Sequence, residues 1–210
     1  MPPLIEPVGL RLVLGGNVFG WTADLDASFA ILDAFYEAGG RMIDTAEGYS
    51  DWIPGHVGGE SETVLGKWMA ARGNRADMHI ATKTGMYGKP GDLAPAKLAA
   101  AVEGSLKRLQ TDYIDLYYAH RDETATDQAE AAQGFGALVT AGKVRTLGAS
   151  NFTADRLATA RAAAKAQGVA VSRDEARTMV YGMPYDDWKA KHQAAASDDQ
   201  KAKFAQSHKH

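Results

Sequence analysis

The sequence predicts an α/β fold built on a parallel sheet, and two observations support this prediction. Short apolar runs typical of strands alternate with amphipathic helical segments five times along the chain. Four of the apolar runs also end in polar residues. Helical crossovers of this kind join parallel strands, and functional residues of parallel β/α proteins gather where the strands end.

Composition limits the class of protein further. The chain has 210 residues, of which 45% are hydrophobic and 23% charged, as in an ordinary globular protein with one main domain. A net charge of -3 gives no electrostatic reason to expect nucleic acid or an anionic membrane as a partner. The absence of cysteine excludes disulfides and thiolate chemistry. With no leader-like N-terminus and no membrane-spanning run, we expect a cytoplasmic protein.

The first unit begins with a candidate strand at 12–14. The glycine-rich stretch 15–20 that follows fits either a loop whose backbone passes close to a ligand or a plain turn. From Asp26 onward the apolar spacing predicts a helix that stops at Gly39. Its apolar residues are Phe29, Leu32 and Phe35.

The second unit starts with a strand at 41–44, which ends in Asp44. A glycine-rich loop at 51–59 leads into a helix whose first residues, 60–62, include two acids that suit a helix N-terminus. The apolar stripe of this helix predicts core packing rather than ligand contact. The stripe consists of Val64, Leu65, Trp68 and Met69, and the helix ends at 72–74.

The last three units repeat the pattern. Their strands are predicted at 79–83, 114–120 and 144–149. Their helices are marked by apolar residues within 98–109, by apolar residues within 135–139 before Gly142, and by the alanine-rich stretch 154–167. We expect Thr153 to cap the last of these helices and Gly168 to end it.

Residues 169–210 differ in character from the rest of the chain. The segment 169–171 is a candidate sixth strand, but charges of both signs and helix-capping residues follow it. These features predict three short helices, at 172–181, 186–192 and 197–204. Three short helices are a poor continuation of a β/α pattern, so we predict a division into residues 8–168 and a helical tail at 169–210.

The polar residues at the predicted strand ends suggest a chemistry. Asp44, Lys83 and His120 each close a strand, and Tyr49 follows Asp44 by five residues. A tyrosine is a useful general acid only if its pKa, about 10 in model peptides, is brought toward neutrality. A neighbouring lysine held by an aspartate does this, a histidine can orient a carbonyl, and Ser150-Asn151 could hold a carboxamide. Together these residues suit carbonyl reduction by hydride transfer.

Each residue alone has a plainer explanation. A single lysine or histidine at a strand end more often forms a structural ion pair, and Tyr49 alone suggests loop packing. Their joint placement is what favours a site. The G-x-G-x-x-G fingerprint of a Rossmann fold is absent. A zinc site is not expected, because no ligand spacing relates His56, His79, His192, His208 and His210.

Five segments together resemble the aldo/keto reductase family. They are DTAEGY at 44–49, GESETVLG at 59–66, ATK at 81–83, DYIDLYYAH at 112–120 and GKVRTLGASNF at 142–152. The likeness covers about residues 8–168. It implies a (β/α)8 barrel of the TIM type, the cofactor NADPH/NADP, and reduction of a small-molecule aldehyde or ketone.

The resemblance also implies a role for each motif residue. Tyr49 is the expected proton donor, and Asp44, Lys83 and His120 complete a catalytic tetrad. The residues expected to contact the cofactor are Gly20, Thr22, Asp44, Ser150 and Asn151, of which the last two hold the nicotinamide amide.

The chain also departs from that family. A complete barrel needs about 250 residues, so we expect an incomplete TIM-type barrel of five parallel βα units and a candidate sixth strand, followed by short C-terminal helices. In the family, the missing units carry an aromatic residue that stacks on the nicotinamide and a loop that grips the 2′-phosphate. Residues 171–191 instead resemble the C-terminal part of a small bacterial family of unknown function. A seam near 165–171 suggests a fusion.

Two functional hypotheses therefore stand. The first is an NADPH-dependent oxidoreductase that uses Tyr49 as proton donor. The second is a truncated, catalytically silent remnant that acts in oligomerisation or partner binding, because an unfinished barrel exposes strand edges and apolar faces. A homo-oligomer would cover such edges.

Overall fold

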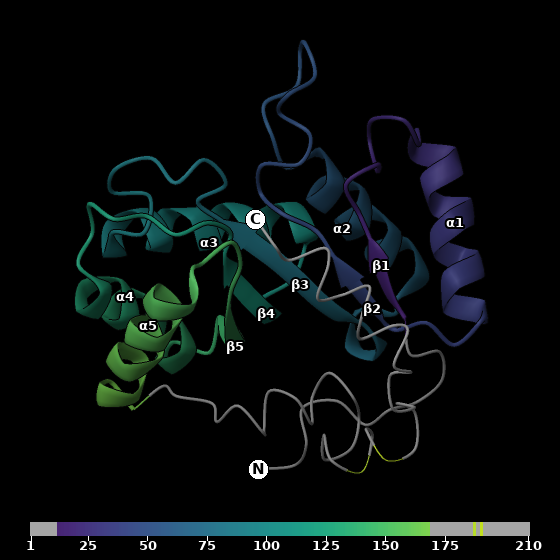
Figure 1. Ribbon diagram of the computed structural model, residues 1–210. Coiled ribbons are helices and arrows are strands. Elements are labelled where there is room, and N and C mark those ends of the chain that lie inside the picture. Colours follow the sequence, from purple (N-terminus) through teal and green to yellow (C-terminus); the bar gives the residue numbers. More distant parts are fainter. Residues whose placement is uncertain (1–11, 169–186, 188–189, 191–210) are drawn as a thin grey trace, which may run out of the picture. The chain divides into compact units, whose positions relative to one another are not determined.

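The computed structural model describes residues 12–168, together with Asp187 and Ala190. Strands and α-helices alternate along the described chain (Figure 1). The strands are β1 (Val13–Gly15), β2 (Met42–Asp44), β3 (His79–Thr84), β4 (Ile114–Ala119) and β5 (Val144–Ala149). The α-helices are α1 (Leu25–Glu37), α2 (Glu60–Arg72), α3 (Pro95–Leu109), α4 (Gln128–Thr140) and α5 (Ala154–Ala166), and a 3-10 turn covers Arg75–Asp77.

The strands form one parallel sheet in the order β1-β2-β3-β4-β5. The register pairs the last residues of β3, β4 and β5 with one another, so these three strands end level. β1 and β2 end three residues earlier, because Asp44 pairs with Ala81. Within the described residues the sheet is open, with β1 and β5 at its edges. This arrangement is an incomplete TIM-type α/β fold, and it confirms the predicted parallel strands in sequential order.

The helices pack beside one another in sequence order, from α1 to α5, as the outer ring of a β/α barrel does (Figure 1). The core lies between these helices and the sheet. Tyr117 of β4 is fully buried there and meets Phe135 of α4 edge-on, whereas Leu116 and Tyr118 on the opposite face of β4 are half-buried. The predicted apolar stripes lie in this core: Leu32, Phe35, Val64, Leu65, Trp68, Met69, Leu98, Val102, Leu106, Leu109, Phe135 and Leu138 are all buried.

Side-chain caps begin three of the helices. Thr153 accepts a hydrogen bond from the backbone at the start of α5, which confirms the predicted cap. Asp24 caps α1, two residues before the predicted helix start at Asp26. Asp127 caps α4 by accepting two backbone N–H bonds, a cap that was not predicted because the segment before α4 contains several other residues that can cap a helix.

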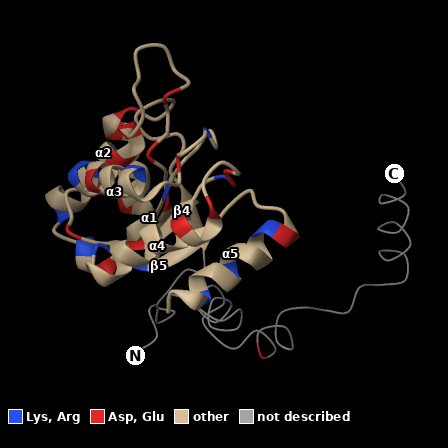
Figure 2. Cartoon of the chain, turned by 90° about the vertical axis from the view of Figure 1, so that its left-hand side faces the viewer, with Lys and Arg blue, Asp and Glu red and all other residues tan. Residues whose placement is uncertain are grey.

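The predicted sixth strand at 169–171 and the tail helices at 172–181, 186–192 and 197–204 lie outside the described residues. Only Asp187 and Ala190 are described there, and both are helical. Among the described helices, none has the length and apolar character needed to cross a bilayer. Basic and acidic side chains are interspersed along the described helices (Figure 2).

Candidate active site

The residues predicted to form a site come together at the carboxyl edge of the sheet. Asp44 is the last residue of β2, and Lys83 lies one residue before the end of β3. His120 follows β4 directly, and its backbone N–H donates to the carbonyl of Thr84. Ser150 follows β5 and donates in the same way to the end of β4. The parallel register therefore places four strand ends side by side.

Lys83 is the centre of this arrangement. Its Nζ donates to Asp44 Oδ2 at 2.7 Å, to the Thr45 carbonyl oxygen at 2.8 Å and to the Tyr49 hydroxyl at 3.3 Å. An ammonium group has three donors, so these contacts use all of them. Lys83 is only 7% exposed. Its charge is therefore fixed beside the hydroxyl of Tyr49, which is delivered by the loop after β2.

His120 completes the predicted group. Its ring lies edge-on to the Tyr49 ring, with centroids 5.9 Å apart. Burial and the nearby Lys83 ammonium lower the pKa of His120 to about 4, because both disfavour a second positive charge. His120 is therefore neutral at neutral pH. In the described part of the chain, its buried Nδ1 has no hydrogen-bond partner, and no group of three or more ligating side chains could hold a metal ion.

Ser150 and Asn151 are tied to this histidine. Asn151 adopts a left-handed backbone conformation with φ of 57°. Its Nδ2 donates to the His120 carbonyl oxygen at 2.8 Å and to Ser150 Oγ at 3.1 Å. The Asn151 carboxamide oxygen makes no hydrogen bond to any described residue, so it can accept from an amide N–H.

Gly20 and Thr22 lie in a tight turn after β1. The turn is closed by a hydrogen bond from the Gly20 N–H to the Ala23 carbonyl oxygen. Gly20 has φ of 76°, and a Cβ there would lie 3.1 Å from the Cβ of Glu60, so glycine is needed. Thr22 is exposed, and within the described residues it forms no hydrogen bond with any member of the tetrad.

Two tryptophans that the sequence analysis did not assign to the site connect this turn to Tyr49. Trp21 lies between Gly20 and Thr22 and meets Trp52 edge-on, with ring centroids 5.6 Å apart. Trp52 in turn meets the Tyr49 ring at 5.9 Å. The available signal was an aromatic residue in each of two glycine-rich loops. The contact between Lys83 and the Thr45 carbonyl oxygen could not be predicted from the sequence, since every residue has a backbone carbonyl group.

Glu62 has a different role from the one that its position suggested. The sequence placed it as an acid at a helix N-terminus, but the structure buries it completely. Its carboxylate accepts from Thr82 Oγ1 at 2.5 Å and from Arg108 Nε at 2.7 Å. Glu62 therefore connects α2 to α3 and to the residue that precedes Lys83 in β3.

The sequence is similar to several known proteins. It is 59% identical over 75 residues to an uncharacterised 11.2 kDa protein of Pseudescherichia vulneris. The aligned segment covers 35% of this chain and 73% of that protein. A norsolorinic acid reductase of Emericella nidulans is 40% identical over 163 residues, 68% of this chain and 40% of that protein. An aryl-alcohol dehydrogenase [NADP(+)] of Phanerodontia chrysosporium is 40% identical over 146 residues, 63% of this chain and 36% of that protein.

The chain thus spans about two fifths of the length of the last two relatives. The family model of the aldo/keto reductase family matches residues 11–182, which is most of the chain and extends past residue 168. The match includes every strand and helix that carries the site. On this basis, the chain belongs to the aldo/keto reductase family.

Proposed function

We propose that the chain is an NADPH-dependent oxidoreductase that reduces the carbonyl group of a small aldehyde or ketone. One observation carries this proposal: the Lys83 ammonium binds Asp44, Thr45 and the Tyr49 hydroxyl at the same time. A fixed positive charge beside a phenol stabilises the negative charge that the oxygen acquires when its proton leaves. Tyr49 is therefore the proposed proton donor.

The proposed reaction needs one hydride and one proton. NADPH, when bound, supplies the hydride, which carries two electrons to the carbonyl carbon. Tyr49 gives its proton to the carbonyl oxygen, so that the C=O double bond becomes an alcohol, and the tyrosine regains a proton from solvent. Asp44 holds Lys83 in place, and neutral His120 can donate a hydrogen bond to the carbonyl oxygen and orient it.

The strand-end residues fit the nicotinamide part of the cofactor. The carboxamide oxygen of Asn151 and the hydroxyl of Ser150 can pair with the nicotinamide carboxamide, next to His120. Gly20 and Thr22 are proposed cofactor contacts from the turn after β1, and Asp44 from β2. The preference for NADPH rests on the family and on the NADP(+) in the name of the aryl-alcohol dehydrogenase relative.

The aromatic surroundings of Tyr49 favour an aromatic carbonyl substrate. Trp21 and Trp52 are 42% and 40% exposed, which is unusual for such large apolar side chains. Trp52 meets the Tyr49 ring edge-on and Trp21 meets Trp52, so a planar ring could pack against this row of aromatic side chains. The name of one relative, aryl-alcohol dehydrogenase, agrees with this choice.

A second candidate function is a silent remnant that acts in oligomerisation or partner binding. The observation in its favour is the edge of the sheet at β1, where Leu12 and Val13 are 55% and 50% exposed. An exposed apolar strand edge is a template for pairing with another chain. A homo-oligomer through this edge is compatible with either candidate.

A cofactor titration distinguishes the two candidates. The purified chain is titrated with NADPH while the fluorescence of the cofactor is followed, and benzaldehyde is then added to the complex. Saturable binding followed by consumption of NADPH supports the reductase. Absence of binding, or binding without turnover of any aromatic aldehyde tested, would favour the remnant.

A further inference from the structure

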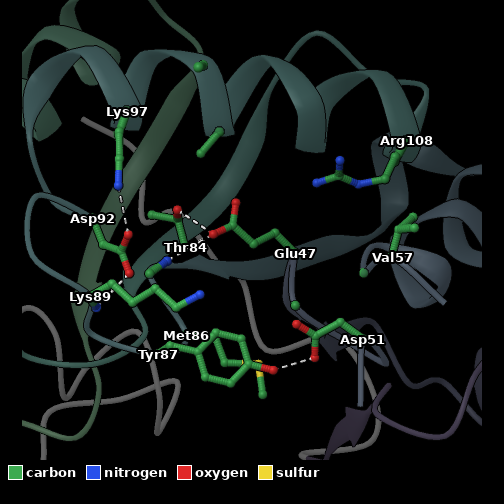
Figure 3. Close-up of a pocket in the computed structure, with 15 residues that line it drawn as sticks. Glu47, Asp51, Val57, Thr84, Met86, Tyr87, Lys89, Asp92, Lys97 and Arg108 are labelled. Atoms are coloured by element: carbon green, nitrogen blue, oxygen red, sulfur yellow. Dashed lines mark hydrogen bonds and ion pairs between the residues drawn. The ribbon is translucent and has the colours of Figure 1, made fainter. Parts of the chain in front are cut away.

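A cavity of about 400 Å³ lies next to the tetrad but is not lined by any of its four residues (Figure 3). Its walls come from three places: the loop that carries Tyr49, the loop after β3, and the exposed side of α3. Pockets that bind small molecules have volumes of roughly 300–1,000 Å³. The cavity is therefore large enough for a ligand of its own.

One wall of the cavity presents a carboxylate without a cation. Glu47 Oε1 accepts from Thr84 Oγ1 at 2.7 Å and from the Gly85 N–H at 2.9 Å, while its other oxygen points into the cavity toward α3 (Figure 3). Among the described residues, no lysine, arginine or histidine forms an ion pair with Glu47. Burial raises the pKa of its carboxyl group, and neither its two hydrogen bonds nor the nearby Arg108 guanidinium cancels that effect; a further cation in the cavity would lower the pKa.

Lys89 provides a positively charged group that faces the same cavity. Its ammonium group points inward from the loop after β3 and lies 5.1 Å from the centroid of the Tyr87 ring (Figure 3). In the described part of the chain, no carboxylate lies within ion-pair distance of Lys89. Glu47 and Lys89 thus face the same space without neutralising each other.

The other charged groups of the lining already have partners. The contacts are Asp92 with Lys97 at 3.1 Å, Asp51 with the Tyr87 hydroxyl at 2.6 Å, and Arg108 with Glu62 at 2.7 Å. Asp92, Lys97 and Arg108 are therefore paired with opposite charges, whereas Asp51 is bonded to a neutral hydroxyl. Glu47, whose second oxygen points into the cavity, and Lys89 are the two groups without an ion pair that we assign to a ligand.

We propose that this cavity binds a zwitterion of amino-acid size, with the ligand's ammonium group at Glu47 and its carboxylate at Lys89. Such a molecule supplies a counter-ion to both groups at once, whereas a singly charged ligand leaves one of them unpaired. Val57, Ala100 and Ala101 also line the cavity and suit an apolar side chain. The proposal goes beyond the reductase activity and requires neither cofactor nor turnover.

The first test compares three probes that differ only in charge. The full chain, without cofactor, is titrated by calorimetry with L-leucine, with isoamylamine, which lacks the carboxylate, and with isocaproate, which lacks the ammonium group. We expect saturable binding of leucine at least about tenfold tighter than either analogue, since each analogue loses one charge-assisted contact. No saturable binding of leucine, or equal affinity for all three probes, would overturn the proposal.

Variants of the two charged residues locate the site. Glu47→Gln keeps an acceptor for Thr84 and should reduce the affinity for leucine to that for isocaproate, without changing isocaproate binding. Lys89→Met, at an exposed position that does not endanger folding, should reduce leucine binding to the level of isoamylamine. The matched controls Glu37→Gln and Lys107→Met remove exposed charges outside the cavity and should change nothing. Leucine affinity that is unaffected in both cavity variants would place any binding elsewhere and refute the assignment.

Discussion

At the scale of single residues, the contacts of Lys83 limit which group can act as the acid. All three of its donors are engaged, so the ammonium has no proton directed at a substrate. His120 has a pKa of about 4 and is therefore a neutral imidazole at neutral pH, without the additional proton that an acid would donate. Asp44 accepts from the Lys83 ammonium at 2.7 Å and forms an ion pair with it. Tyr49 is then the group of the tetrad left to donate a proton to a carbonyl, which supports its proposed role.

Replacement of Tyr49 tests this directly. We expect Tyr49→Phe to lower kcat for benzaldehyde by about 10²- to 10⁴-fold, the usual contribution of a positioned general acid. Urea unfolding should show little change, because the ring and its contacts with Trp52 and His120 are kept. The control is Tyr113→Phe, whose ring packs between Arg75 and Arg145. An unchanged kcat in Tyr49→Phe would remove this residue from the mechanism.

The lowered pKa of His120 predicts how stability depends on pH. In the unfolded chain His120 takes up a proton near its ordinary pKa of 6.5, whereas in the folded protein it does so only near 4. Between these values the unfolded state binds more protons, so the free energy of unfolding falls as the pH falls. The His120 contribution is fully present above pH 6.5 and is lost progressively toward pH 4.

The variant His120→Gln should therefore flatten this pH dependence. Urea denaturation of both proteins at several pH values between 6.5 and 4 measures the slope. Other groups, including His79, whose pKa is also lowered by burial, continue to contribute in the variant. Identical slopes for the two proteins would show that His120 titrates normally in the folded state.

At the scale of elements, the contact between α2 and α3 supports the site from behind. Glu62 of α2 binds both Arg108 of α3 and Thr82 of β3, the neighbour of Lys83. The two helices can approach this closely because α2 has Gly66 at the crossing. A Cβ at Gly66 would collide with the backbone carbonyl of Arg108 and would lie 2.7 Å from the carbonyl carbon of Leu109.

Two glycine substitutions distinguish this close contact from helix propensity. Gly66→Ala should lower the free energy of unfolding by about 1–3 kcal/mol through overpacking, although alanine is the better helix former. Gly104→Ala in α3 is the matched control, since its Cβ would meet no backbone and only the guanidinium end of the Arg108 side chain, at 3.1 Å. This control should be neutral or stabilising by up to about 1 kcal/mol. Equal effects in a urea titration would argue against a tight crossing.

At the scale of the whole molecule, the described sheet is stabilised mainly from the helical side. The helix-facing side of β4 is buried, but Leu116 and Tyr118 on the other face are half-buried, and β1 and β5 are edges. The proposed cofactor contacts come from the ends of β1, β2 and β5. A ligand that touches all three would hold strands together across the sheet.

Cofactor binding should therefore stabilise the entire described unit. At a free NADPH concentration 100-fold above Kd, the expected gain is about 2.7 kcal/mol. Thermal or urea unfolding with and without NADPH measures this gain in stability. NADH, which lacks the 2′-phosphate, serves as the comparison. The Tyr49→Phe protein should show the same gain, since binding does not need the proton donor. Unfolding curves that neither cofactor shifts would favour the silent remnant.

The five strands, the five helices and their order could be predicted from local patterns in the sequence. Apolar periodicity marked the helix faces that are buried in the structure, such as Leu98 and Val102 in α3, because burial of one face is a property of each segment. It also placed Asp44, Lys83 and His120 at one edge, since parallel strands end together. The family motifs gave these residues roles that only experiments on the protein can test.

The contacts between distant side chains, in contrast, depend on the packing of the folded chain. The three partners of Lys83, the position of Trp52 beside Tyr49, and the burial of Glu62 against Arg108 all join residues that loops and helix packing bring together. The cavity between Glu47 and Lys89 is of the same kind. Periodicity reports how a segment faces the core, but the distance between two segments depends on how their side chains pack, which no local pattern in the sequence encodes.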